Sequence, residues 1–446
     1  MAGIGSSSFF NRCEMRSNII LSSILVFFIS MTTEIGFGSS SNEMSVEFID
    51  HAWGIDLWAR RDMLTNLPFS LVSSQDGTVV WFASQKQYRD LEKSDHLAPK
   101  SESHTAKALT EAHGETWKRQ RKVMQQRVLS HGLALAEEFG EQVGQTLAQQ
   151  LIEKTISGPV DIDLQEFLKE GIAQWVSGLF LGKVDQDVIS SFLPFWESLR
   201  SLESLSSEKK QQLRKTFETK LQTASGGFIG YMRSNIDDNN GFKKDEVIPN
   251  AVFAMTAAFE TTLDIIFWTF VGLSESSESL RLNVAKSAQK TSDNWQAIRQ
   301  ALIRMKTQAT SGQLVDPIDK DLLIVRSILE TLRVYPPVWF FSRPLQKMGA
   351  DNIAEAVRLD VVLANQSTDR NWDPLVDRYL PLASFGVGKK SCPGGNAALL
   401  GSAIILSHIL KSFSLDEKNS GHAVNSSHLT PNLYVDGEQL FTIRPL

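Results

Sequence analysis

The stretch that most constrains this chain is a glycine-rich loop that carries a cysteine and runs directly into an apolar helix. The loop reads Ser384-Phe385-Gly386-Val387-Gly388-Lys389-Lys390-Ser391-Cys392-Pro393-Gly394-Gly395, and the helix is expected from Asn396 to about Phe413. Glycines let a backbone turn tightly and approach a flat group closely. The first peptide N–H groups of a helix favour negative charge. The pattern therefore predicts that Cys392 acts as a thiolate at a helix start.

Cys392 is suited to bind a metal inside a macrocycle. A thiolate ligand must stay deprotonated, be shielded from water and have hydrogen-bond donors nearby. Phe385 can cover the sulfur, and the N–H groups of Gly394 and Gly395 can point toward it. We interpret Cys392 as the thiolate ligand of a haem iron. The alternative is a buried structural cysteine near a helix start, which is the commoner role of a lone cysteine.

The pattern Phe385-x-x-Gly388-x-x-x-Cys392-x-Gly394 resembles the haem-binding loop of the cytochrome P-450 family. The resemblance covers roughly residues 75–446 and is strongest after Pro249. It implies a mainly α fold with a minor β region, haem b (iron protoporphyrin IX) as cofactor, and Cys392 as the metal ligand. Because all the motifs are expected to serve one site, we expect a single haem-thiolate domain over residues 43–446.

A helix that opens at Gly114 places Trp117 and Arg121 on one face, because the two residues are four apart. An indole N–H and a guanidinium at this spacing can bind a carboxylate such as a haem propionate. A surface cation–π contact is the alternative. The pair resembles the family's Trp-x-x-x-Arg helix. The resemblance also implies cofactor contacts for Arg343 and for Lys390, where lysine replaces the usual Arg or His and supplies a point charge.

A long helix is expected from Pro249 to about Leu273, with an acid and a hydroxyl inside an otherwise apolar centre. Burying Glu260 and Thr261 costs free energy unless they have partners. Thr261 can donate to the carbonyl of Ala257 and open a groove. The stretch resembles the family's oxygen-activation motif, which implies a catalytic, proton-guiding role for Glu260 and Thr261. Ala258 stands where the family usually has glycine, and the alternative is a capped or solvent-facing Glu-Thr pair.

A further helix is expected to be capped by Asp316-Pro317 and ended by Pro336-Pro337. Within it, Glu330 and Arg333 are three apart and resemble the family's Glu-x-x-Arg motif. The resemblance adds Arg378, just before the cysteine loop, as a third member. One carboxylate shared by two guanidiniums would lock the helix to the cofactor loop, so we assign these residues a structural role.

The substrate wall is predicted from apolar side chains near the expected site. Two such residues lie on the long helix, Phe253 and Ala257, and three follow the proline pair, Val338, Trp339 and Phe340. They suggest an apolar molecule such as a terpenoid, sterol or fatty acid. The residues of Gly77–Phe82 follow an Asp-Gly turn and are β-branched and aromatic, which predicts a strand.

The composition and the amino-terminal segment indicate which partners and which cellular location to expect. The net charge of −6 makes nucleic acid an unlikely partner, and two cysteines, Cys13 and Cys392, are too few for a disulfide framework. Residues 1–42 hold a charge-free run, Ser17 to Thr33, and a Gly/Ser linker. We expect an anchor on the endoplasmic reticulum with the catalytic part facing the cytoplasm. A secretory signal peptide, a wrongly assigned first exon or a soluble cytoplasmic protein are the alternatives.

The resemblance implies an oxidoreductase that inserts one oxygen atom of O2 into an apolar substrate. Electrons would come from NADPH through a reductase or ferredoxin, which would dock near Lys389 and Lys390. One alternative is a haem-thiolate isomerase or dehydratase of lipid hydroperoxides, whose members tend to lack the Glu260-Thr261 pair. The other is a degenerate, non-catalytic haem-binding relative, suggested by Ala258 and by the shortened segment before Asp377.

Overall fold

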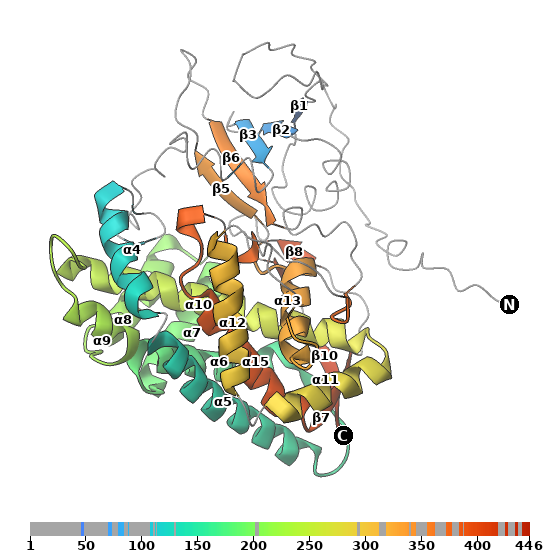
Figure 1. Cartoon of the computed structure of the whole chain (residues 1–446). Coiled ribbons are helices and arrows are strands. Elements are labelled where there is room, and N and C mark those ends of the chain that lie inside the picture. Colours follow the sequence, from blue (N-terminus) through green and yellow to red (C-terminus); the bar gives the residue numbers. More distant parts are fainter. Residues whose placement is uncertain are drawn as a thin grey trace.

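The structure is a computed structural model, and most of its described residues are helical (Figure 1). The prediction of a mainly α fold with a minor β region is confirmed. The described residues are 46–48, 70–73, 79–83, 88, 108–109, 112, 114–128, 131–200, 205–291, 295–311, 318–338, 340–344, 355–361, 372–376, 383–386, 388–417, 424–426, 433–435 and 439–446.

The helices form the body of the molecule and most of the strands lie at its edges (Figure 1). The helices are α4 (Gly114–Val128), α5 (His131–Thr155), α6 (Leu164–Leu181), α7 (Gln186–Arg200), α8 (Ser207–Leu221), α9 (Gly227–Ser234), α10 (Val247–Ser274), α11 (Glu278–Thr291), α12 (Trp295–Ser311), α13 (Leu323–Val334) and α15 (Gly395–Leu410). Short 3-10 turns are η1 (Lys244–Glu246), η2 (Ala383–Phe385) and η3 (Gly388–Lys390).

The strands pair across long stretches of sequence. They are β1 (Val46–Phe48), β2 (Ser70–Ser73), β3 (Val79–Ala83), β4 (Val160–Asp163), β5 (Phe340–Pro344), β6 (Glu355–Asp360), β7 (Phe413–Glu417), β8 (Val424–Ser426), β9 (Leu433–Val435) and β10 (Leu440–Pro445). One sheet has the order β1-β2-β3-β6-β5, a second the order β4-β10-β7, and β8 pairs with β9. In the first sheet β3 is parallel to β6, so an early strand lies beside one from the last quarter of the chain.

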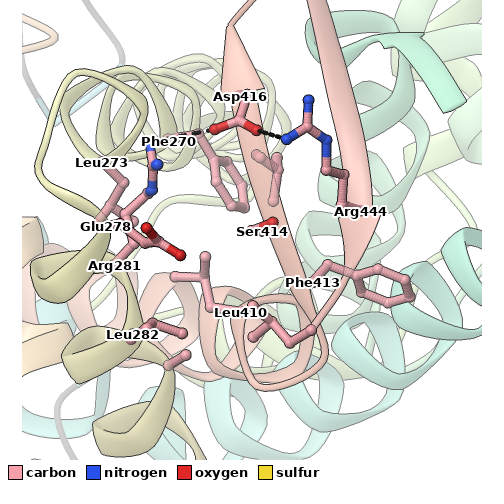
Figure 2. Close-up of a pocket in the computed structure, with 13 residues that line it drawn as sticks. Phe270, Leu273, Glu278, Arg281, Leu282, Leu410, Phe413, Ser414, Asp416 and Arg444 are labelled. Carbon is pink, nitrogen blue, oxygen red and sulfur yellow. Dashed lines mark ion pairs between the residues drawn. The ribbon is translucent and has the colours of Figure 1, made fainter. Parts of the chain in front are cut away.

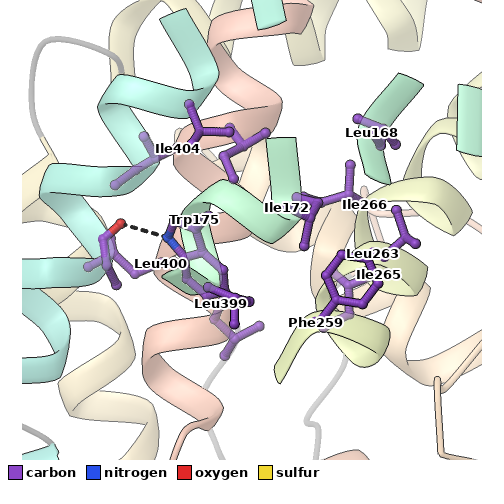
Figure 3. Packing of buried hydrophobic residues seen from close by; sticks show 14 of the residues in the cluster. Leu168, Ile172, Trp175, Phe259, Leu263, Ile265, Ile266, Leu399, Leu400 and Ile404 are labelled. Carbon is purple, nitrogen blue, oxygen red and sulfur yellow. Dashed lines mark hydrogen bonds between the residues drawn. The ribbon is translucent and has the colours of Figure 1, made fainter. Parts of the chain in front are cut away.

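Helix α10 runs through the centre of the core and packs against α6, α13 and α15. Figure 3 shows side chains of α6 and α10 meeting on one side and side chains of α6 and α15 meeting on the other. Trp175 of α6 is fully buried, and its indole Nε1 donates to the carbonyl of Ala136 at 3.2 Å. Burial of apolar side chains at about 25 cal/mol per Å² is the main stabilising term for such a body.

Within the described part of the chain, one helical stretch is long and apolar enough to cross a membrane, Lys244–Ser274, with a mean hydropathy of 1.4. Because 67% of its most apolar window is buried inside the protein, this stretch is the core helix of the fold. The apolar run from Ser17 to Thr33 lies outside the described residues, so the predicted amino-terminal anchor stays a prediction.

Helix α15 docks closely on α5 through a glycine. A Cβ atom at Gly144 would lie 2.7 Å from Cδ2 of His408, so only glycine lets the two helices approach this far. His408 Nε2 in turn lies 2.9 Å from Oε2 of Glu141, and the indole of Trp295 on α12 donates to the same carboxylate. Burial lowers the pKa of His408, while the contact with Glu141 opposes this. Glu141 of α5, His408 of α15 and Trp295 of α12 therefore join the three helices at one partly buried point.

Two predicted helix ends were wrong, for local reasons. The helix expected from Asp316-Pro317 begins at Leu323, because residues 318–322 form a turn in which the N–H of Leu322 donates to the carbonyl of Asp319. The helix expected to reach Phe413 ends at Leu410. Phe413 instead begins β7, whose pairing with β10 competes successfully with further helix.

An open cavity lies at the far end of α15, near Leu410 (Figure 2). Asp416 of β7 is flanked there by Arg281 at 3.2 Å and Arg444 at 3.0 Å. A helix of 16 residues spans about 24 Å, so this cavity is far from the cysteine that precedes α15. The two ion pairs join α11, β7 and β10.

Candidate active site

The cysteine loop is folded onto itself by backbone hydrogen bonds. The N–H of Cys392 donates to the carbonyl of Phe385 at 2.6 Å, and the N–H of Gly386 donates to Ala383 at 2.7 Å. Gly386 and Gly388 have φ angles of 74° and 71°, in the left-handed region that glycine adopts without strain. The two glycines thus allow two tight turns, which bring Cys392 back beside Phe385.

The sulfur of Cys392 sits among donors. The peptide N–H groups of Gly394 and Gly395 donate to it, and the guanidinium of Arg121 acts on it electrostatically. The side chain is exposed, yet it lies among enough protein atoms that desolvation raises the pKa of the thiol; the two N–H groups and Arg121 oppose this rise. A Cβ at Gly395 would lie 3.0 Å from the Phe385 ring, so the ring packs directly against the start of α15.

Helix α4 brings its two predicted residues to the same place. Arg121 is buried, and burial lowers its pKa while the nearby Cys392 opposes this. Trp117 is half-buried, and Nζ of Lys390 lies 5.6 Å from the centre of its ring. Lys390 also donates to the carbonyl of Ala112 at 3.3 Å. The structure therefore brings Trp117, Arg121, Lys390 and Cys392 into one region, with the guanidinium of Arg121 acting on the sulfur.

Helix α10 is buried all round except along one stripe. The stripe comprises Pro249, Phe253, Ala254, Thr256, Ala257, Ala258 and Thr261, which lie on one broad face of the helix. Thr261 Oγ1 donates to the carbonyl of Ala257 at 2.8 Å, the hydrogen bond expected from the sequence. Phe253 is 38% exposed, so this aromatic ring is available to a ligand. Beyond Thr261 the helix is wholly buried as far as Leu273.

Glu260 points away from that stripe, into the protein. It is 7% exposed, and its Oε1 lies 4.0 Å from Nε of Arg200 at the end of α7. Arg200 stacks over the ring of Trp196 at 4.6 Å. One turn later Asp264 is also buried, and desolvation raises the pKa of Asp264 well above its usual range; Arg200 opposes this rise and Glu260 adds to it.

Sequence reasoning missed both Arg200 and Asp264. The position of Asp264, four residues after Glu260 in an apolar helix, is the signal that could have found it. Arg200 carried no comparable signal, because its approach to Glu260 depends on how α7 crosses α10. The packing of these two helices is a tertiary property.

The predicted structural pair is buried and bidentate. Arg333 Nε donates to Oε2 of Glu330 at 2.8 Å, and Nη2 donates to Oε1 at 2.6 Å. Oε1 also accepts the N–H of Asp373 at 3.0 Å. Ser384 of the cysteine loop donates to the carbonyl of Leu332 at 2.8 Å. Helix α13 is thereby joined to the segment 372–376 and to the cysteine loop.

Several predicted residues fall partly or wholly outside the described residues. Arg378 and Trp339 are not described, and Phe340 and Arg343 are described only as backbone in β5. Val338 is half-buried beside β5. Their predicted contacts with cofactor or substrate stay predictions.

The residues that are present fit a haem. A soft sulfur ligand with N–H donors suits iron, and buried or half-buried cations on α4 and at Lys390 suit propionate carboxylates. Within the described part of the chain, no cluster of His, Cys, Asp and Glu offers a different metal site. The accessible stripe of α10 adds a mostly apolar face that ends in a hydroxyl.

No family model matches the chain. It is 29% identical to "Cytochrome P450 714C2" of Oryza sativa subsp. japonica over 122 residues, which are 22% of this chain and 23% of that protein. It is 24% identical to "Cytochrome P450 CYP72A613" of Trigonella foenum-graecum over 239 residues, 47% of this chain and 41% of that protein. The chain thus spans less than half the length of the curated relatives it matches.

A solved structure is similar over most of the chain. It is the "Retinoic acid bound cyanobacterial CYP120A1", with a TM-score of 0.64, 16% identity, and coverage of 88% of this chain and 95% of that one. At this identity the likeness shows the fold, which is that of the cytochromes P450. Together with the curated relatives it confirms the resemblance predicted from the cysteine loop.

Proposed function

Because this chain has the cytochrome P450 fold and is related in sequence to cytochromes P450, we propose that it is a haem-thiolate monooxygenase acting on an apolar organic substrate. The observation that carries the proposal is the surrounding of Cys392, where two peptide N–H groups and a buried guanidinium act on one accessible sulfur. Such donors stabilise a thiolate, and a thiolate ligand favours O–O cleavage at a haem iron.

When bound, the haem would supply dioxygen activation, and the residues of this chain would hold and protect it. Cys392 would ligate the iron, with Phe385 and Gly388 shaping the loop and Gly394 donating to the sulfur. Arg121, Trp117, Lys390 and Arg343 would bind the propionates.

Helix α10 would line the reaction space. Phe253 and Ala257, joined by Val338, Trp339 and Phe340, would exclude water and hold an apolar substrate. The Thr261 hydroxyl is occupied as a donor to Ala257, so its oxygen remains free to accept a hydrogen bond. Glu260 would move protons toward that oxygen, because cleavage of an O–O bond requires that a proton reach one of its two oxygen atoms.

The electrons would come from NADPH through a reductase or ferredoxin, and the catalytic part would face the cytoplasm from the endoplasmic reticulum membrane. Lys390 is turned toward Trp117 of α4 and the carbonyl of Ala112 just before that helix, so the partner's docking surface should rely on other residues as well.

The test is the reduced, carbon monoxide-bound absorption spectrum of the full chain, beside Cys392→Ala. A long-wavelength Soret band that the variant loses is expected. Turnover of an apolar substrate with a reductase, NADPH and isotopically labelled dioxygen should place one labelled oxygen in the product. A short-wavelength band, or no bound haem, would overturn the proposal. Consumption of a fatty-acid hydroperoxide without a reductase would instead favour a haem-thiolate isomerase or dehydratase.

A further inference from the structure

Helix α10 carries a second buried acid one turn beyond Glu260. Asp264 is 2% exposed and Glu260 is 7% exposed, although carboxylates are rarely fully buried unless they are paired. Residues four apart lie on the same helix face, so the two carboxyl groups are neighbours. Within the described part of the chain, Oδ2 of Asp264 has no hydrogen-bond partner. An unpartnered oxygen is far less costly on a neutral acid than on a carboxylate.

One guanidinium serves both acids. Arg200 pairs with Glu260 at 4.0 Å and also acts electrostatically on Asp264. Among the described residues, Arg200 from α7 and Glu260 from α10 itself are the charged groups that act on Asp264. Two carboxylates at such a site cannot both ionise at low cost, so the pair holds one proton.

Trp196 also lies at this site, where its ring packs against the guanidinium of Arg200. Its ring lies 4.6 Å below the guanidinium of Arg200 and packs edge-on against Phe259 at 4.8 Å. The indole Nε1 of Trp196 is buried and, among the described residues, has no acceptor. Arg200 is 13% exposed, so the cluster reaches solvent at its outer edge.

We infer that Asp264 is a positioning residue that stores the proton used by Glu260, an inference that rests on the proposed monooxygenase function. In the resting pair Asp264 carries the proton, and Glu260 carries the negative charge opposite Arg200. The O–H bond of Asp264 breaks as an O–H bond forms on Glu260, directly or through one water. The negative charge thereby moves one helical turn and stays opposed by the same guanidinium.

Glu260 then releases its proton on the side of Thr261, and the pair briefly carries two negative charges. A proton from solvent, entering at the partly exposed Arg200, restores the acid on Asp264. Charge and protons balance over the cycle, and solvent is the ultimate proton source. Asp264 never touches the reacting atoms and acts only through Glu260.

The first arm of the test detects the stored proton without any turnover. Infrared spectra of the full chain at neutral pH should contain the carbonyl stretch of a protonated carboxylic acid, and Asp264→Asn should abolish it. Asp187→Asn, at an acid whose side chain is 83% exposed, is the matched control and should leave the band unchanged. Glu260→Gln removes the like charge, so the band should titrate away at lower pH. A band that survives in Asp264→Asn overturns the inference.

The second arm uses the haem-loaded protein with a reductase. Asp264→Asn should lower product formed per NADPH about tenfold, with peroxide released instead, since losing a proton-transfer group outright costs roughly 10²–10⁴-fold. Its solvent deuterium isotope effect should rise. If the unaltered protein turns over and Asp264→Asn matches it in both readouts, the inference fails while the proposed function stands. If the unaltered protein shows no thiolate spectrum, the proposed function fails, and the inference fails with it.

Discussion

The buried pair between Glu330 and Arg333 allows a quantitative test of what holds α13 to the cysteine loop. Arg333→Met removes two charge-assisted hydrogen bonds of 2.8 and 2.6 Å and leaves Glu330 as a buried carboxylate. Both side chains are at most 4% exposed, so water cannot replace the lost donor. Removing one partner of a buried pair costs about 3–5 kcal/mol, and we expect a loss in that range.

The assay is urea unfolding followed by circular dichroism, with the change in midpoint converted through the slope. A double variant, Glu330→Leu with Arg333→Met, separates the charge effect from packing. Replacing a whole buried ion pair by apolar residues of similar size is often neutral, so the double variant should recover most of the loss. The double variant should remain about 1 kcal/mol less stable than the unaltered protein, because the N–H of Asp373 loses its acceptor.

The matched control is a surface pair with the same spacing. Lys118 and Glu115 are also three apart and also 2.6 Å from each other, but their side chains are 65% and 88% exposed. Lys118→Met should barely move the midpoint, because water screens and replaces the contact. Two results would refute the reasoning. One is a loss of stability below about 1 kcal/mol for Arg333→Met, and the other is a loss in the double variant as large as the sum of the losses in the two single variants.

Two further outcomes are expected. Gly144→Ala should destabilise the protein by about 1–3 kcal/mol, measured by urea unfolding, because its Cβ would lie 2.7 Å from His408. The control is Gly140→Ala, whose Cβ would have a nearest contact of 3.3 Å and which should destabilise the protein less. Equal unfolding midpoints for the two variants would contradict this prediction. Asp264 binds its proton more tightly in the folded chain than in the unfolded one, so the free energy of unfolding should fall as pH rises from the ordinary range of Asp, by up to about 1.4 kcal/mol per pH unit. Asp264→Asn should flatten that slope, and an unchanged slope between the two proteins would show that Asp264 is ionised.

The sequence pattern predicts which helices form, but where a helix ends depends on whether the next residues are more stable in the helix or in another element. The long apolar helix was expected from Pro249 to about Leu273 and runs over Val247–Ser274. The helix after Cys392 was expected to reach Phe413, where strand pairing stops it three residues earlier. Such pairing joins segments distant in sequence, and no local propensity reports it.

The candidate site likewise has one part that the sequence predicts and one part that it does not. The motif around Cys392 is a continuous stretch whose turns need glycine at fixed positions, so it can be read from the sequence. The surroundings of Glu260 need two helices, α7 and α10, to meet. Arg200 is 60 positions away along the chain, and nothing near it in sequence marks it as a partner of an acid on α10.

Aromatic packing determines how α10 is rotated in the core. Phe259 is fully buried and lies against two rings of α7, Phe192 at 5.1 Å and Trp196 at 4.8 Å. Successive residues of an α-helix are turned by about 100°. With Phe259 fixed in the core, Glu260 must face Arg200 and Thr261 must face the accessible stripe. These aromatic core side chains therefore determine the directions in which Glu260 and Thr261 point.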